Sequence, residues 1–292
     1  IEISDIRNTE LNIKPLLSLI SSKFKSLKAK HGWGTNPFYY LSGKNSVHPT
    51  YVQEMMVDSR YEEEDIISVI QNLGSKGGKK YSKNSLLEAR NYYSQISQGS
   101  WSPLDLFEGK EVILIGPGPG VSSHKRAIED YIKNSKPLVI ALNAHSSINN
   151  DLIDVRIACH PLRLKTDCEK LSSLSQPLIM PASSIPSDVL DLMPSVEILD
   201  YGLSVQTHQL KYDKTSCILS NPIVISYALA VASSGKAKRL LLAGFDGYSP
   251  DDPLRIENDM IFKAHQDIDS AVPLLAVTPT FYNINSTSIY AL

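Results

Sequence analysis

The sequence has few cysteines and no long apolar run. Its three cysteines, Cys159, Cys168 and Cys217, cannot all pair with one another, and none has the CxxC spacing of a zinc site. This usage favours a reduced setting, so we expect a cytoplasmic protein. No apolar run approaches the roughly 18 residues that span a bilayer, and no basic-then-apolar signal pattern opens the chain. We therefore expect a soluble protein without a membrane span.

An excess of one charge is also missing. The 292 residues carry 29 Lys and Arg against 31 Asp and Glu, which gives a net charge of −2 and a pI near 6.4. The basic residues are scattered rather than clustered, so we expect no nucleic-acid partner. A chain of this length fits two domains of about 100 to 200 residues each. Because it begins with Ile1 rather than Met, we expect a fragment of a longer protein.

Residues 1–98 are predicted to be all-helical. Apolar residues recur at helical spacing from 11 to 30, and residues 32–37 break that helix. A second helix is predicted from His48 to about Val57, and a third follows the acidic run 62–65, with Ile66, Ile67 and Ile70 facing inward. Ser82 is predicted to cap a fourth helix that ends near residue 95.

The pattern changes after a Gly-, Ser- and Pro-rich stretch, which predicts a linker over residues 99–110 and a second domain over 111–292. Short continuous apolar runs, typical of strands buried on both faces of a parallel sheet, alternate there with helix-length segments. We therefore predict an α/β, Rossmann-like, doubly wound and mostly parallel sheet. The predicted strands are 112–115, 138–142, 155–159, 178–180, 240–243 and 274–277.

The first of these strands runs into a glycine-rich loop, residues 116–120. Gly116, Gly118 and Gly120 let the backbone come close to a phosphate or a sugar, while Pro117 and Pro119 stiffen the loop. The spacing is neither GxGxxG nor that of a P-loop, which would also require a lysine. The loop therefore predicts a phosphate-bearing ligand, although a stiff turn without a ligand would have the same composition.

Polar residues follow several other predicted strands. In a doubly wound sheet these ends meet at one edge, where ligands bind. Asn143 is a candidate for a base or ribose, Asp246 for a hydroxyl, and Tyr248 for a phosphate or a stacked ring. Ser220 and Asn221 precede a helix and are a further candidate pair, although plain capping explains the same residues. His265 lies in a predicted helix, 256–270, where we expect a surface or boundary residue.

The order of these features in residues 111–280 resembles bacterial sialyltransferases that use CMP-sialic acid and the related motility accessory factor proteins. The resemblance is carried by residues 113–119, 141–143, 157–161, 178–180, 220–232, 242–248 and 275–279. It implies a CMP-linked nucleotide-sugar as ligand, with Gly116, Gly118 and Asn143 at the nucleotide and Ser220 and Asn221 bordering the donor site.

One residue of that family is missing. Its catalytic histidine belongs between the strand that precedes Asp246 and the last helix, but residues 249–255 contain no histidine. A general base is typically worth about a hundredfold to ten-thousandfold in rate, so the domain is predicted either to use a substitute base or to bind the ligand without turning it over. Asp251 and Asp252 are weak candidates for a substitute base.

The first module resembles a different group, the helical region after the barrel of HMG-CoA lyase superfamily aldolases such as 4-hydroxy-2-oxovalerate aldolase. The likeness is carried by residues 32–34, 39–43, 48–53 and 65–67. It implies a parent lyase that uses a divalent metal bound on barrel strands absent from this chain. We expect no cofactor and no metal site in the chain itself. An unrelated helical adaptor is the alternative.

Together, these features predict the C-terminal part of a bifunctional aldolase and glycosyltransferase-like protein of bacterial surface-polysaccharide or sugar-acid biosynthesis. This part would bind a nucleotide or nucleotide-sugar, with homo-oligomerisation as a further possibility. The alternative is a non-catalytic nucleotide-binding or oligomerisation domain of the aldolase. A dehydrogenase is disfavoured, because no acidic residue stands convincingly about 20 residues past the glycine loop.

Overall fold

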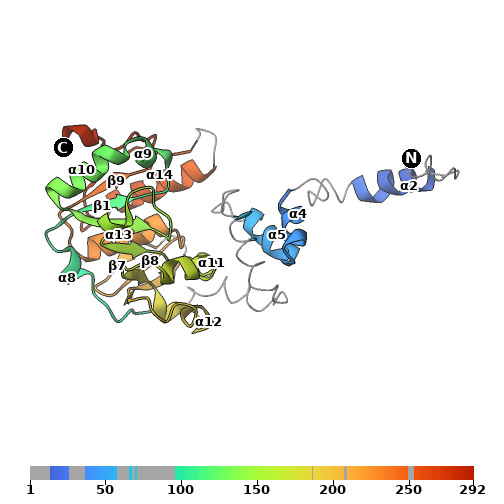
Figure 1. The fold of residues 1–292 in the computed structure, drawn as a ribbon, viewed down its shortest axis with the longest axis horizontal. Helices are drawn as coiled ribbons and strands as arrows, with labels where there is room; N and C mark the ends of the chain where they lie inside the picture. The colour runs from blue at the N-terminus through green and yellow to red at the C-terminus, as the bar shows by residue number, and fades with distance from the viewer. Residues whose placement is uncertain are drawn as a thin grey trace. The chain divides into compact units, whose positions relative to one another are not determined.

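A computed structural model describes residues 14–25, 37–57, 66–67, 70, 96–185, 187–206, 209–248 and 253–292 (Figure 1). The chain divides into two compact units, Ile1–Tyr81 and Ser82–Leu292, and each is considered by itself. Within the described residues, no helix is long and apolar enough to cross a membrane.

The regular elements described in the first unit are all helices. Its elements are α2 (Lys14–Leu19), the π-helix η1 (Ile20–Phe24), α4 (Pro37–Lys44) and α5 (Pro49–Val57). Helix α5 confirms the predicted second helix. The inward-facing positions of Ile66 and Ile70 are also confirmed, because both side chains lie in a small core with Phe38, Val47, Val52 and Met55.

Two features of this unit differ from the prediction. Helix α4 was not predicted, because Pro37 was interpreted as part of a helix break, whereas it is the first residue of the helix, where the missing N–H costs nothing. The described side chains of α2 and η1 are exposed or half-buried, and Ile20 is 42% exposed. The predicted fourth helix, capped by Ser82, lies outside the described residues.

The second unit contains a seven-stranded sheet in the order β10-β9-β1-β2-β3-β4-β5, with every neighbouring pair parallel. This confirms the predicted Rossmann-like α/β fold and all six predicted strands, with small shifts at their ends. The strands are β1 (Glu111–Ile115), β2 (Leu138–Leu142), β3 (Val155–Ile157), β4 (Leu178–Met180), β5 (Ile198–Asp200), β9 (Arg239–Ala243) and β10 (Leu274–Ala276).

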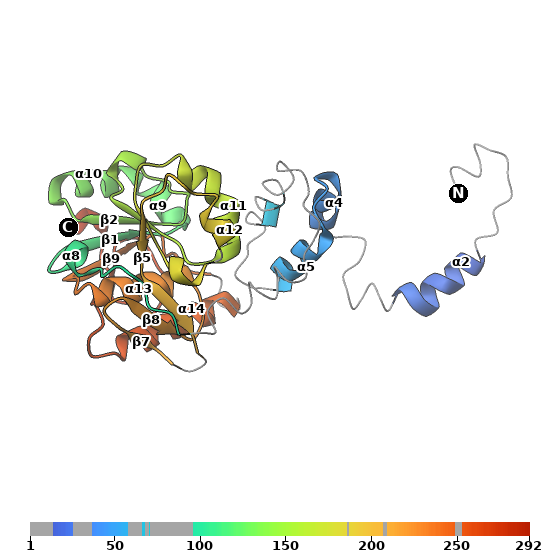
Figure 2. The same ribbon diagram turned by 90° about the horizontal axis from the view of Figure 1, so that it is seen from below.

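Helices cover both faces of the sheet. The side chains of each central strand point alternately to the two faces, so they pack into two separate cores. On β1, Ile113 and Ile115 pack with α10 (Lys125–Ser135), while Val112 and Leu114 pack with α13 (Val224–Ser234) and α14 (Pro253–Gln266) (Figure 2). The remaining helical elements are α8 (Leu104–Phe107), α9 (Pro119–Ser123), η2 (Asn150–Leu152), α11 (Pro161–Ser172), η3 (Ala182–Ser184), α12 (Ser187–Leu190) and η4 (Ile289–Ala291).

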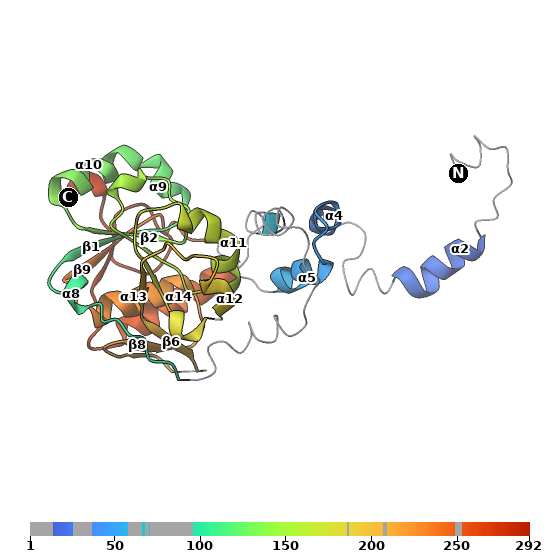
Figure 3. The ribbon, with the colours of Figure 1, turned by 60° about the horizontal axis from the view of Figure 1, so that its bottom comes forward.

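Helix α13 is enclosed on both sides. A second sheet of three strands, β6 (Gly202–Val205), β8 (Ser216–Leu219) and β7 (Lys211–Tyr212), lies on the side of α13 away from β1 (Figure 3). Every residue of α13 from 225 to 233 is consequently buried. A helix that is apolar nearly all round is typical of such a position. The three strands themselves were not predicted.

The predicted linker, residues 99–110, is attached to the second unit along its length. The Gly99 N–H donates to Thr215 O at 3.1 Å, and the Trp101 N–H donates to Asp200 O at 2.9 Å. A Cβ atom at Gly99 would lie 2.1 Å from Asp200 O, so the glycine is required by close packing. Phe107 of α8 is fully buried in the main core. This stretch is therefore part of the folded domain.

Candidate site at the carboxyl edge of the sheet

The direction of winding reverses between β1 and β9. From β1 the sheet extends through β2 to β5, and on the other side of β1 it continues through β9 and β10. Helix α10, which follows β1, and helix α14, which follows β9, cover opposite faces of the sheet. Such a switch point leaves a crevice at the carboxyl ends of the two strands, where doubly wound proteins bind ligands. The sequence places the glycine loop after β1 and Asp246 after β9, so both lie at this point.

The two loops are in direct contact. The Gly116 N–H donates to Ala243 O at 2.8 Å, and the Gly118 N–H donates to Gly244 O at 2.9 Å. A Cβ atom at Gly118 would lie 2.1 Å from Asp246 Oδ2, and one at Gly120 would lie 2.6 Å from Asp246 Oδ1. The Asp246 carboxylate therefore packs against the loop in the space that side chains at positions 118 and 120 would fill. The glycines are needed for this packing whether or not a ligand binds.

Among the described residues, one oxygen of Asp246 has no hydrogen-bond partner. Its Oδ2 atom is buried and accepts no hydrogen bond from the described part of the chain. A buried acceptor left in this state costs about 1–3 kcal/mol. A donor supplied by a ligand would recover that free energy, so the carboxylate is suited to receive a hydroxyl group.

The contact between Gly120 and Asp246 can be tested by a double-mutant cycle. Gly120→Ala is expected to lower the free energy of unfolding by about 1–2 kcal/mol, because the added methyl group must displace the carboxylate. In an Asp246→Ala background the same change is expected to raise it by about 0.5–1 kcal/mol, since alanine is the better helix former and Gly120 lies in α9. Urea unfolding of the four proteins measures the difference. Equal effects in both backgrounds would show that the two residues do not interact.

Asn143 follows β2 with a left-handed φ of 58°. Its N–H donates to Ile157 O at 2.9 Å, and its carbonyl accepts from Arg156 Nη1 at 3.0 Å. Asparagine tolerates this conformation better than most residues. These two hydrogen bonds fix the backbone of Asn143 at the carboxyl end of β2, and its side chain is half-buried there.

Arg156 is a site residue that the sequence analysis missed. It is 1% exposed, and besides Asn143 it donates to Asn150 Oδ1 at 2.7 Å and to Gln176 Oε1 at 3.4 Å. Burial lowers the pKa of its guanidinium group. The available signal was a single charged residue inside an apolar run that was predicted to be buried on both faces.

The other candidates lie further along the same edge. Cys159 donates to Pro222 O at 3.4 Å, which brings the loop before α13 to the end of β3. In that loop Asn221 Nδ2 donates to Glu257 Oε1 of α14 at 2.7 Å, and Ser220 Oγ donates to Gln209 O at 3.3 Å. Both side chains are therefore engaged with the protein. Tyr248 is half-buried against the main core. Asp251 and Asp252 lie outside the described residues.

The expectation for His265 was wrong. The side chain is 1% exposed rather than at the surface. Its Nε2 lies 2.9 Å from Val272 O, and its Nδ1 lies 3.1 Å from the Tyr212 hydroxyl. A carbonyl only accepts, so Nε2 carries the proton and Nδ1 accepts from the tyrosine. Burial lowers the pKa of His265, although the hydrogen bond to Val272 opposes the shift.

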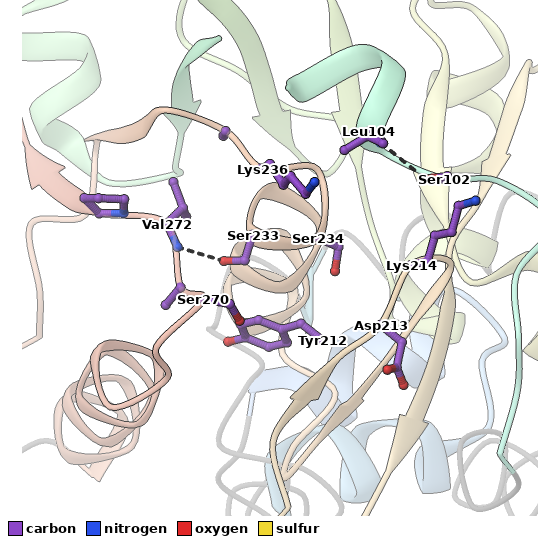
Figure 4. A pocket seen from close by; sticks show the side chains of 13 residues that line it. Ser102, Leu104, Tyr212, Asp213, Lys214, Ser233, Ser234, Lys236, Ser270 and Val272 are labelled. Carbon is purple, nitrogen blue, oxygen red and sulfur yellow. Dashed lines mark hydrogen bonds between the residues drawn. The ribbon is translucent and has the colours of Figure 1, made fainter. Parts of the chain in front are cut away.

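A cavity lies at the opposite edge of the sheet. Its volume is about 610 Å³, and its lining includes residues that directly precede β9 and β10, together with Ser102 and Leu104 (Figure 4). Lys214, Lys236 and the hydroxyl groups of Ser233 and Ser234 line it, among other residues. It is separate from the carboxyl edge that holds Asn143 and Asp246. None of the predicted ligand-binding residues lines it.

Two further observations concern the cysteines and the side chains that could bind a metal. Cys159, Cys168 and Cys217 are all free and buried. Within the described residues, no group of three His, Cys, Asp or Glu side chains is close enough together to hold a metal ion.

Comparison with known proteins gives a similarity at the level of structure. No protein-family model matches the sequence, and neither does any curated protein. Among solved structures, the chain is similar to the MAf glycosyltransferase of Magnetospirillum magneticum AMB-1, with a TM-score of 0.49 and 12% sequence identity. The match covers 80% of this chain and 43% of that one. The α/β fold described above is established by the strand order and register and does not depend on this similarity.

Proposed function

We propose that the second unit binds a nucleotide or a nucleotide-sugar at the carboxyl ends of β1, β2 and β9, with CMP as the first nucleotide to test. The main support is the position of Asp246 at the switch point, with a buried carboxylate oxygen that lacks a partner among the described residues. A ribose or sugar hydroxyl is the matching donor. The sequence resemblance to glycosyltransferases that use CMP-linked donors agrees with this ligand.

In this proposal the glycine loop has a different role from the predicted phosphate cradle. Two negative charges about 4 Å apart repel by roughly 4 kcal/mol at an effective dielectric constant near 20. The N-terminus of a helix offers an anion only about 0.3–1 kcal/mol, and α9 has only five residues. The repulsion is the larger effect, so a phosphate beside Asp246 is disfavoured. We propose that Gly118 and Gly120 allow Asp246 to approach the loop closely. Asp246 would then bind a hydroxyl group of the ligand, and Asn143 would bind the base or the ribose.

Sugar transfer is the further step of the proposal, and binding without transfer is the second candidate. The sequence between Asp246 and α14 contains no histidine, which favours the binding role unless Asp251 or Asp252 acts as the base. Consumption of a CMP-sugar in the presence of glycan acceptors supports transfer. CMP binding without such consumption supports the binding role.

The test of binding is a titration of CMP, CDP, UDP and NAD by calorimetry and thermal shift. A ligand at a hundred times its dissociation constant should stabilise the protein by about 2.7 kcal/mol. Asp246→Asn is expected to weaken CMP and cytidine binding by tenfold or more, since a hydrogen bond to a charged group contributes about 1.5–3 kcal/mol. Asp130→Asn, which removes an exposed carboxylate from α10, should leave binding unchanged. If no nucleotide stabilises the protein the proposal fails, and a preference for NAD would point to a dehydrogenase instead.

For the first unit we retain the proposal that it is the tail of an aldolase-like lyase. The divalent metal that such a lyase requires would be bound by barrel residues that this sequence does not contain. A cytoplasmic location and homo-oligomerisation are further proposals, of which the first agrees with the three free cysteines.

A further inference from the structure

Basic side chains gather beside Asn143. His145 lies in the loop after β2, Arg156 lies on β3, and Arg163 and Lys170 lie on α11. Lys170 Nζ is 2.7 Å from His145 Nδ1, and Arg163 Nε is 3.8 Å from Asp167 Oδ2. The electrostatic neighbours of His145 are three cations, Lys170, Arg163 and Arg156, and one acid, Asp167. We refer to His145, Arg163 and Lys170 as the basic cluster.

The contact between Lys170 and His145 determines which groups can bind a ligand. An ammonium group only donates, so Nδ1 of His145 must accept and the imidazole carries its proton on Nε2. Partial burial lowers the pKa of His145, and so do the charges of Lys170, Arg163 and Arg156, while Asp167 opposes them. A neutral His145 therefore presents an N–H donor next to an ammonium group with further protons to donate. Both side chains remain accessible to solvent, although that of His145 is partly covered.

The basic cluster is continuous with the candidate site. His145 follows Asn143 by two residues, and Arg156 donates to Asn143 O at 3.0 Å. On the other side, Ser147 of the same loop accepts from Ser122 Oγ of α9 at 3.0 Å. The loop therefore connects the glycine loop and Asp246 with α11 along one edge of the sheet.

We propose that the basic cluster binds the phosphate of the nucleotide, while Asp246 binds a hydroxyl group. The inference rests on the proposed function, and it follows from the charges at the two places. The Asp246 carboxylate repels a phosphate at the glycine loop, whereas the cluster offers a surplus of positive charge and two exposed donors. Charge-assisted hydrogen bonds of this kind are the usual means of phosphate recognition.

The test compares CMP with cytidine, which lacks the phosphate. Wild-type protein is expected to bind CMP at least tenfold more tightly than cytidine. Lys170→Met keeps most of the aliphatic stem but removes the charge, and it is expected to bring the ratio close to one without changing cytidine binding. Lys133→Met removes an exposed lysine from α10 and should leave the ratio as in the wild type. Unchanged cytidine binding also shows that the variant is folded.

The outcomes separate this inference from the proposed function. If CMP and cytidine bind equally to the wild type, or if Lys170→Met keeps the tenfold ratio, the phosphate assignment is overturned while nucleotide binding stands. If neither ligand binds, the proposed function fails, and inorganic phosphate becomes the probe. Stabilisation of the wild type by phosphate, reduced in Lys170→Met and retained in Lys133→Met, would then support an anion site. No stabilisation by phosphate would overturn it.

Discussion

Gly118→Ala is expected to destabilise the second unit by roughly 3 kcal/mol even when no ligand is present. The new Cβ atom would lie 2.1 Å from Asp246 Oδ2 and 2.5 Å from Gly244 O. The carboxylate can rotate away, but the Gly244 carbonyl belongs to a backbone that accepts the Gly118 N–H at 2.9 Å and has a φ of +77°. The loop after β1 must therefore move away from the loop after β9. Urea unfolding followed by circular dichroism measures the loss.

The matching control uses Asp246→Ala. In that background Gly118→Ala should remain strongly destabilising, because the clash with the Gly244 backbone persists, whereas Gly120→Ala should be tolerated. A Gly118→Ala protein as stable as the wild type would show that the two loops do not approach each other as described. For the same reason, larger residues at position 118 cannot be used to block a ligand, because they alter the fold first.

The second large effect concerns His265. His265→Leu is expected to lower the free energy of unfolding by about 2–4 kcal/mol, because Val272 O and the Tyr212 hydroxyl lose their buried partner. The substitution should also change the pH dependence of stability. Folded protein keeps His265 neutral, since burial lowers its pKa below the ordinary value of 6.5, whereas the unfolded chain takes up a proton below that value. Wild-type stability should therefore fall as the pH drops below 6.5.

A conservative variant separates the two contributions. His265→Gln can still donate to Val272 O but cannot take up a proton, so it should lose less stability than His265→Leu and show the same weakened pH dependence. The measurement is the unfolding midpoint between pH 7 and 5.5, where few carboxyl groups titrate. A pH dependence in His265→Leu as steep as in the wild type would show that another group is responsible.

Six of the seven strands of the large sheet were predictable, because they are buried on both faces along most of their length. Runs such as residues 138–142 are then apolar at every position, which is a strong local signal. The edge strand β5 is half-buried throughout. In β7, Lys211 is exposed and Tyr212 is half-buried. In these two short strands, apolar and polar residues alternate less clearly. Their pairing depends on contacts with α13 and with residues 96–110, which no local pattern records.

For the candidate site, the sequence by itself determined which residues follow which strands: the glycine loop after β1, Asn143 after β2 and Asp246 after β9. Only the tertiary structure decided which of these residues contact one another. The parallel pairing of β1 with β9 brings Asp246 onto Gly118, although the two are far apart in the chain. In the proposed site, the charge of that carboxylate disfavours the phosphate that the glycines alone had suggested. The folding of α11 against the loop after β2 brings Lys170 to His145, and this moves the expected phosphate site along the edge.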